Sequence, residues 1–194
     1  MLVKKEGELA APCGLYCGAC MIYRANKRGD AKFLTQIRER FAKIFSALER
    51  GQRPPGMPPS TKEKDFDFTG FREDMRGDLD INCEGCLSSV LGLPCRDCGF
   101  RDCSQRKGLT NCSQCSAAPC KLLVDFSNDG VPHHSEVLNT IKRQKEIGID
   151  AWLSEQEERW RCIQCGSPLA WYDAKCPECN ATPGQTFGSF PLSD

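Results

Sequence analysis

The sequence predicts a small, helix-rich α+β fold built around cysteines, followed by a compact C-terminal cysteine module. Three observations lead to this prediction. Cysteine accounts for 15 of the 194 residues, a share of about 8% that is close to that of scaffolds held together through sulfur. Two long segments carry apolar residues at helical spacing. Near the end of the chain, four cysteines form two closely spaced pairs, a pattern typical of hairpin turns that bring sulfur atoms together.

The chain lacks the apolar segments that export or membrane insertion requires. The N-terminal stretch MLVKKEGELAAPCG has no long apolar run and does not resemble a secretory signal. No stretch of about 18 apolar residues is available to span a bilayer. We therefore expect a cytosolic protein, in which thiols stay reduced and clustered cysteines bind metal more often than they form disulfides.

The first long helix is predicted over residues 30–50, with Asp30 as its N-cap and Gly51 just past its end. Seven apolar residues at helical spacing form a stripe that we expect to face the core: Phe33, Leu34, Ile37, Phe41, Ile44, Phe45 and Leu48. The proline-rich stretch 51–60 predicts a loop. The DFDFTGF segment that follows could form a short strand or remain adaptable.

A second helical segment is predicted from about Ser135 to Arg161, with a break at Gly148. Ser135 and Asp150 are the candidate N-caps of its two halves, because serine and aspartate side chains accept hydrogen bonds from the first backbone amides of a helix.

The C-terminal cysteines have the spacing C-x2-C-x10-C-x2-C and comprise Cys162, Cys165, Cys176 and Cys179. Each pair can form a tight turn, and Gly166 and Asn180 follow the pairs where backbone freedom is needed. Four sulfur ligands at tetrahedral geometry suit structural zinc and leave no open position for catalysis. Iron in a rubredoxin-like site is the alternative.

The central block contains eight cysteines within 38 residues: Cys83, Cys86, Cys95, Cys98, Cys103, Cys112, Cys115 and Cys120. Their spacing contains a repeated C-x2-C-x4-C unit, and each unit leads towards a predicted helix. A sequential grouping takes the first four for one metal ion and the last four for another. An interleaved grouping combines Cys95 and Cys98 with Cys112 and Cys115. The sequential grouping is preferred because it closes shorter loops.

The N-terminal stretch CGLYCGAC adds Cys13, Cys17 and Cys20, which would share one face of a helix, or converge where a loop enters a helix at Tyr16. Eleven cysteines then precede residue 126, and eleven is not a multiple of four. If all eleven are ligands, one site would need a further ligand, and the candidates are His133 or His134 (the only histidines), a carboxylate, water, or a cluster iron with an open position. Alternatively, one cysteine belongs to the core, which is common for this residue. An exposed, solvated histidine pair is the preferred interpretation.

C-x3-C-x2-C also matches the cluster-binding motif of radical S-adenosylmethionine enzymes. We reject that interpretation because the chain has neither the length nor the strand–helix alternation for their barrel. We expect three or four zinc ions in total. An iron–sulfur cluster in the N-terminal and central sites remains the alternative, because clustered thiolates are its ligands too.

The sequence predicts four parts. Residues 1–130 form the cysteine-rich metal-binding domain, 131–159 a helical connector, 160–182 a zinc ribbon of β-hairpin turns, and 183–194 a tail. Two histidines and no glycine-rich phosphate loop leave little for acid–base or nucleotide chemistry, so no catalytic residues are predicted.

Another protein is the expected partner, and neither a membrane nor nucleic acid is. The formal net charge is zero, and metal-bound thiolates would make the protein more acidic, whereas nucleic-acid binding needs basic excess. Arg159, Trp160 and Arg161 are the residues that would favour nucleic acid. Asp65 and Asp67 are interpreted as a solvated strand edge.

The segments CGLYCGACMIYRA, INCEGCLSS and CRDCGFRDCSQRKGLTNCSQCSAAPCKLL, in this order, resemble a cysteine-rich bacterial and archaeal family, domain of unknown function 3795. The resemblance covers roughly residues 11–126, and the segment WRCIQCGSPLAWYDAKCPECN is similar to a ribbon that some members carry. It implies a prokaryotic cytosolic protein that binds metal, and it implies no reaction. The prediction is therefore a multi-zinc structural or interaction module, with an iron–sulfur or redox protein as the alternative.

Overall fold

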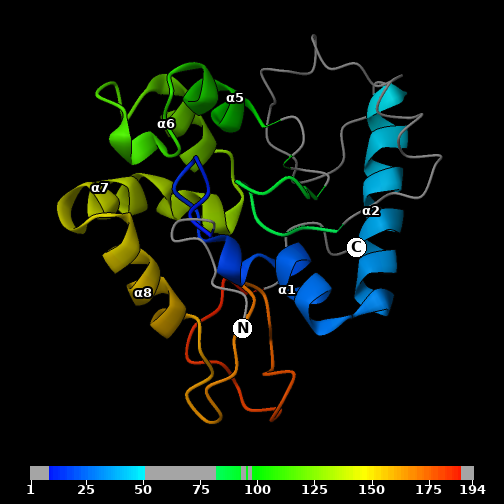
Figure 1. The fold of residues 1–194 in the computed structure, drawn as a ribbon. Helices are drawn as coiled ribbons and strands as arrows, with labels where there is room; N and C mark the ends of the chain where they lie inside the picture. The colour runs from blue at the N-terminus through cyan, green and yellow to red at the C-terminus, as the bar shows by residue number, and fades with distance from the viewer. Residues whose placement is uncertain (1–8, 51–81, 93–94, 96–97, 189–194) are drawn as a thin grey trace.

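The computed structural model shows a helix-rich chain (Figure 1), and it describes residues 9–50, 82–92, 95 and 98–188. The α-helices are α1 (Met21–Arg28), α2 (Ala31–Glu49), α5 (Gly99–Arg106), α6 (Lys121–Ser127), α7 (Val137–Ile147) and α8 (Ile149–Arg159). Three 3-10 helices lie between them: η1 (Cys17–Ala19), η2 (Cys112–Gln114) and η3 (Pro132–Glu136). None of the described helices has both the length and the apolar character needed to cross a membrane.

The expected β-structure is not found in the described part of the chain. Two isolated bridges, Ala10 with Tyr16 and Arg161 with Pro168, are the β pairing there. The predicted β-hairpins of the C-terminal module are therefore replaced by irregular chain with tight turns. The helix-rich part of the fold prediction is confirmed, and its β part is not.

The helix predicted over residues 30–50 is present as α2. The Asp30 side chain accepts a hydrogen bond of 2.9 Å from the Phe33 amide, which confirms the predicted N-cap. Ile37 is buried against Ile22 of α1 and Cys83, which confirms that this part of the stripe faces the core. The side chains of four stripe residues and several other predicted features lie outside the described residues: Phe41, Ile44, Phe45, Leu48, Gly51, the loop 51–60, Asp65 and Asp67.

The second helical segment is broken at Gly148 as predicted, where φ is 83°. Both predicted N-caps are wrong. The N-cap of α7 is Glu136, because η3 precedes the helix and the Ser135 hydroxyl donates to the Pro132 carbonyl, 2.7 Å away. Gly148 itself caps α8, so Asp150 lies inside the first turn. There its negative charge suits the positive end of the helix dipole.

Two buried clusters hold the helices together. The first packs Leu123 of α6 and Val137 and Ile141 of α7 against the N-terminal segment around Cys13 and Cys17. The second joins segments far apart in sequence and comprises Ala10, Tyr16, Ala19, Trp152, Trp160 and Trp171. Each buried aromatic ring removes a large apolar area from water. These rings therefore attach the C-terminal cysteine segment to the rest of the fold.

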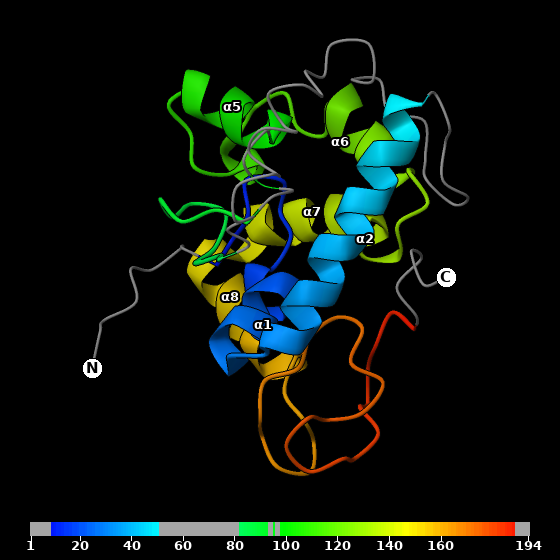
Figure 2. The ribbon, with the colours of Figure 1, turned by 90° about the vertical axis from the view of Figure 1, so that its right-hand side faces the viewer.

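The C-terminal segment and the α5–α6 region lie at opposite ends of the molecule. Figures 1 and 2 show α5 and α6 at the top in both views and the orange-to-red C-terminal chain at the bottom. Helices α1, α7 and α8 lie between these ends. Cysteines from different parts of the sequence are thus distributed over more than one location.

Candidate metal centre

The four C-terminal cysteines converge on one point, as predicted. Their sulfur atoms all lie within 4.8 Å of one another. Cys162 lies 3.6 Å from Cys179, and Cys165 lies 3.6 Å from Cys176. Four sulfurs around a tetrahedral zinc ion, with Zn–S bonds of about 2.3 Å, would be about 3.8 Å apart. The sulfur spacing therefore fits a bound metal ion of this size.

Two tight turns position these sulfurs, one for each cysteine pair. The Gly166 amide donates to the Cys162 carbonyl at 2.8 Å, and the Asn180 amide donates to the Cys176 carbonyl at 2.9 Å. Gly166 has φ 74° and Asn180 has φ 59°, in the left-handed region that favours glycine and tolerates asparagine. The prediction that these two residues supply backbone freedom is confirmed. The residue types that follow each pair thus allow the chain to reverse direction there.

Hydrogen bonds to two of the four sulfurs, those of Cys162 and Cys165, favour the thiolate form that a metal requires. The Ser167 hydroxyl, 3.4 Å from the Cys165 sulfur, and the Ser167 amide lower the pKa of Cys165 to about 6. The amides of Cys165 and Gln164 lower the pKa of Cys162. A thiolate is the form of cysteine that binds metal. Four thiolates fill a tetrahedral site, so this group has a structural rather than a catalytic arrangement.

The other eleven predicted ligands fall into two neighbourhoods. Cys103, Cys112, Cys115 and Cys120 lie around α5, η2 and the start of α6. The remaining thiols gather near η1 and α1: Cys13, Cys17, Cys20, Cys83, Cys86, Cys95 and Cys98. Among the described residues, the C-terminal set is the one whose ligand atoms all lie within 4.8 Å.

The N-terminal trio does not lie on one helix, as one interpretation of its spacing predicted. Cys13 lies in a turn, Cys17 begins η1, and Cys20 is the N-cap of α1. The loop enters the 3-10 helix η1 at Tyr16, its N-cap, in agreement with the alternative interpretation, and α1 begins at Met21. Gly14, with φ 93°, explains why a continuous helix does not form there.

Sulfurs from the N-terminal and central segments lie together in this neighbourhood. Cys86 lies 3.4 Å from Cys95, and its thiol is also hydrogen bonded to Cys17. Burial raises the pKa of the Cys20 thiol, and the charges of the neighbouring Cys95, Cys17 and Cys83 thiols add to this effect. The N-terminal and central cysteines therefore share one neighbourhood.

The two histidines are not an exposed pair, so that expectation is wrong. Nδ1 of His133 lies 2.6 Å from the Tyr172 hydroxyl, and its ring is stacked on Trp171 with centroids 4.1 Å apart. Nδ1 of His134 lies 2.8 Å from Asp129. Burial lowers the pKa of His133 to about 2. Both rings belong to an aromatic cluster that joins η3 to the C-terminal segment.

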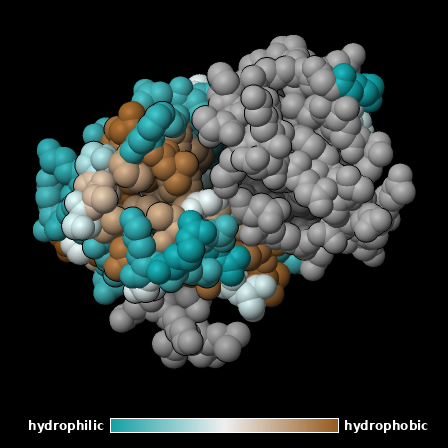
Figure 3. Space-filling view, turned by 90° about the horizontal axis from the view of Figure 1, so that it is seen from above, coloured by the Kyte–Doolittle hydropathy of each residue, from teal (hydrophilic) through white to brown (hydrophobic). Residues whose placement is uncertain are grey.

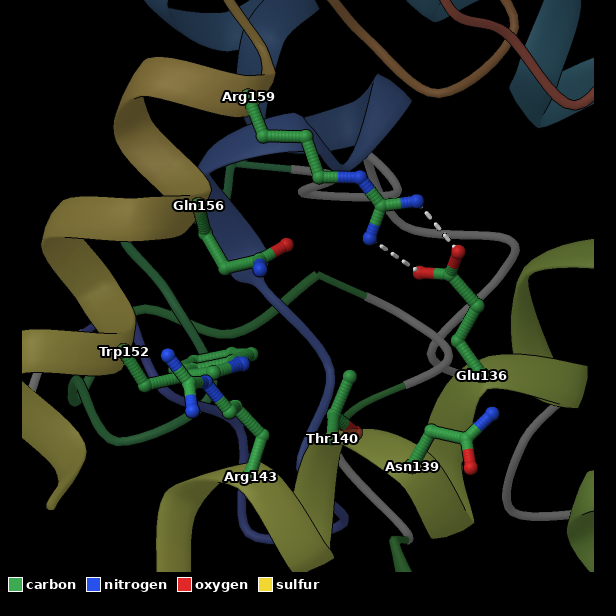
Figure 4. Close-up of a pocket in the computed structure, with 7 residues that line it drawn as sticks. All are labelled: Glu136, Asn139, Thr140, Arg143, Trp152, Gln156 and Arg159. Atoms are coloured by element: carbon green, nitrogen blue, oxygen red, sulfur yellow. Dashed lines mark hydrogen bonds and ion pairs between the residues drawn. The ribbon is translucent and has the colours of Figure 1, made fainter. Parts of the chain in front are cut away.

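A cavity of about 180 Å³ opens between α7 and α8 (Figure 4). Its charged lining residues are already paired. Arg159 forms a bidentate ion pair with Glu136, which Figure 4 shows as two dashed lines. Arg143 is paired with Glu155 on α8. The cavity therefore presents no unbalanced charge that would favour an ionic ligand, and the cysteine groups remain the candidate sites.

Comparison with known proteins agrees with the cysteine pattern. Residues 9–125 match the family described as "Protein of unknown function (DUF3795)". No curated protein matches the chain, and no solved structure matches it. The matched segment contains the N-terminal and central cysteines, ends before η3, and covers more than half of the chain. The chain therefore belongs to the DUF3795 family of proteins of unknown function.

Proposed function

We propose that this protein is a metal-stabilised structural module whose C-terminal cysteines, Cys162, Cys165, Cys176 and Cys179, hold one zinc ion. The observation that carries this proposal is the convergence of four sulfurs within 4.8 Å on two tight turns. Zinc contributes folding free energy directly when such a site closes. The surrounding rings of Trp160 and Trp171 would transmit that stabilisation to the helices, because they belong to the same buried cluster as Tyr16.

Metal analysis of the anaerobically purified full chain tests this proposal. We expect zinc, no visible absorption, and one metal ion fewer per chain in the Cys165→Ser variant. Ser167→Ala is the matched control, since it removes a hydroxyl beside the Cys165 sulfur and leaves all four ligands in place. Equal metal content in wild type and Cys165→Ser would refute the site. Iron at this site, with the red colour of a rubredoxin-like centre, would refute zinc as the metal.

The alternative is an iron–sulfur or redox protein that uses the N-terminal neighbourhood. It is favoured by the gathering of Cys17, Cys86 and Cys95 with further thiols nearby, which exceeds what one zinc ion needs. A brown protein containing iron and acid-labile sulfide would support this alternative. Such a result would leave the C-terminal zinc proposal intact if Cys165→Ser still removed one zinc ion.

We further propose that the partner of this module is a protein rather than a nucleic acid. Arg159 and Arg161, which favoured nucleic acid in the sequence, are paired with Glu136 and Glu157, and Trp160 is only 2% exposed. A buried ring cannot stack on a base. Fluorescence anisotropy with a generic DNA duplex and a single-stranded RNA should show no salt-dependent binding, and tight binding that weakens with salt would contradict the proposal.

Exposed apolar side chains support a protein partner. Leu122 and Val124 of α6 are 37% and 39% exposed. Figure 3, which views the α5–α6 end, shows apolar patches among polar ones on the described surface. Cross-linking in cells should capture partner proteins. These should be lost in the Leu122→Glu, Val124→Glu double variant and retained in Lys142→Glu, which alters an exposed residue on α7. Identical partners for both variants would exclude this surface.

A further inference from the structure

We propose that Cys103, Cys112, Cys115 and Cys120 bind a second zinc ion, at the end of the molecule opposite to the C-terminal site. Each ligand lies at a defined place in the fold. Cys103 belongs to α5, Cys112 begins η2, Cys115 directly follows η2, and Cys120 is the N-cap of α6. Figures 1 and 2 show α5 and α6 together at the end away from the C-terminal chain.

The turn from Cys112 to Cys115 repeats a feature of the C-terminal site. The Cys115 amide donates to the Cys112 carbonyl at 3.0 Å, and the Cys115 sulfur accepts a hydrogen bond from the amide two residues later, in Ala117. The sulfurs of Cys165 and Cys179 accept from the amides two residues later in the same way. These bonds orient the sulfur towards a common point and favour the thiolate.

A buried asparagine holds this turn in place. Asn111 caps η2, with its side-chain oxygen 2.7 Å from the Ser113 amide. Its side-chain nitrogen donates to the Ala11 carbonyl at 2.8 Å, and the Cys112 amide donates to the Pro12 carbonyl at 2.8 Å. The turn is thus fixed to the N-terminal segment. A ligand pair held in this way loses little further conformational freedom when a metal ion binds.

Contacts around the four thiols indicate that they surround a single location. The Lys107 ammonium lies 3.5 Å from the Cys115 sulfur. Lys107 is the C-cap of α5, one helical turn after Cys103, so this contact brings the Cys103 end of α5 to the turn that contains Cys115. Cys112 and Cys120 both pack against the same buried cluster. A cation at this location would relieve the repulsion among four thiolates, and Lys107 would offset part of the remaining negative charge.

The same contacts favour the sequential grouping over the interleaved one for this site. Cys95, which the interleaved grouping pairs with Cys112, instead lies 3.4 Å from Cys86. No three of the four proposed ligands have all their sulfurs within 4.8 Å, the spacing found at the C-terminal site. A change of χ1 rotamer moves a cysteine sulfur by about 3 Å, so we expect metal binding at this site to be accompanied by side-chain rearrangement.

Zinc content of variants of the full chain tests the grouping. We expect Cys103→Ser, Cys112→Ser and Cys120→Ser each to lose one zinc ion per chain relative to wild type, and the Cys103→Ser, Cys112→Ser double variant to lose no more than either single variant. Retention in Cys103→Ser together with loss in Cys112→Ser, or loss of two ions in the double variant, would favour the interleaved grouping and overturn the proposal. Retention in all three would also overturn it. Cys165→Ser reports separately on the C-terminal site, so each site can fail without the other.

A second variant keeps the test decisive where a cysteine variant fails to fold. Lys107 is exposed and is not a proposed ligand, so Lys107→Ala leaves all four sulfurs in place. We expect Lys107→Ala to lose its second zinc ion to a competing chelator at a chelator concentration about fivefold lower than wild type requires. This is the effect of removing one exposed positive charge near an anionic site. Lys142→Ala, an exposed lysine on α7, is the matched control and should behave as wild type. Equal zinc retention in Lys107→Ala and Lys142→Ala would overturn the proposal.

Discussion

Replacing His133 with phenylalanine should remove a defined part of the pH dependence of stability. In the folded protein, burial lowers the pKa of His133 to about 2, from an ordinary value of 6.5. Below pH 6.5 the unfolded chain therefore binds a proton that the folded chain does not, and folding stability falls as the pH falls. Phenylalanine keeps a ring to stack on Trp171 and removes the titration.

The size of this effect follows from the two pKa values. At pH 7.5 the unfolded histidine is almost fully neutral and the penalty is below about 0.1 kcal/mol, whereas at pH 5.5 it is about 1.4 kcal/mol. The folded pKa of about 2 lies so far below 5.5 that its exact value does not alter this result. Wild type should therefore lose about 1.4 kcal/mol more stability than His133→Phe between these two pH values.

Urea denaturation followed by circular dichroism, at constant excess zinc, measures this difference. Loss of the hydrogen bond between His133 and the Tyr172 hydroxyl lowers the stability of the variant at both pH values and cancels in the comparison. Phe187→Leu is the control, since it alters the same ring cluster without removing a titrating group. If wild type and His133→Phe lose equal stability on acidification, His133 titrates normally and its burial in a neutral form is refuted.

Three further substitutions, with Gly108→Ala as the control for Gly14→Ala, test the packing by urea denaturation. Trp171→Ala removes the buried ring that stacks on His133, and should cost about 3–5 kcal/mol of unfolding free energy. Asn111→Ala removes the cap of η2 and a buried hydrogen bond to the N-terminal segment, and should cost about 2–3 kcal/mol. Gly14→Ala should cost about 2–4 kcal/mol, because φ is 93° and the added Cβ would lie 2.8 Å from a side-chain carbon of α7. Gly108→Ala, at φ 67° with nothing within 4 Å, should cost about 1 kcal/mol. Equal losses of unfolding free energy in Gly14→Ala and Gly108→Ala would contradict the packing described. So would losses below about 1 kcal/mol in Trp171→Ala and Asn111→Ala.

Local patterns in the sequence predicted the features that depend on a few neighbouring residues. Two cysteines separated by two residues, followed by Gly166 or Asn180, are enough to define a turn, so the C-terminal convergence could be predicted. Asp30 and Gly148 likewise act through their own backbone surroundings. In each case the physical cause lies within about five residues of the signal.

Features that depend on distant contacts could not be predicted in this way. His133 is buried because Trp171 and Tyr172, about 40 residues later, pack around its ring. Cys17 likewise approaches Cys86 and Cys95 across roughly 70 residues, a contact that no local pattern encodes. The expected β-hairpins are not found in the described C-terminal segment for a different reason. The turns at the cysteines supply its backbone hydrogen bonds, and Trp160 is buried without a strand ladder.

The hydrogen bond from the Trp171 amide to the Ala19 carbonyl has a consequence for biosynthesis. These residues are separated by roughly 150 positions, which a ribosome adds in about 8 to 30 s. During that time the N-terminal core around Tyr16 has no tryptophan from the C-terminal segment to cover it. The nascent chain therefore carries exposed thiols and apolar surface until its last cysteine pair has emerged, and such surface favours aggregation for as long as it stays uncovered.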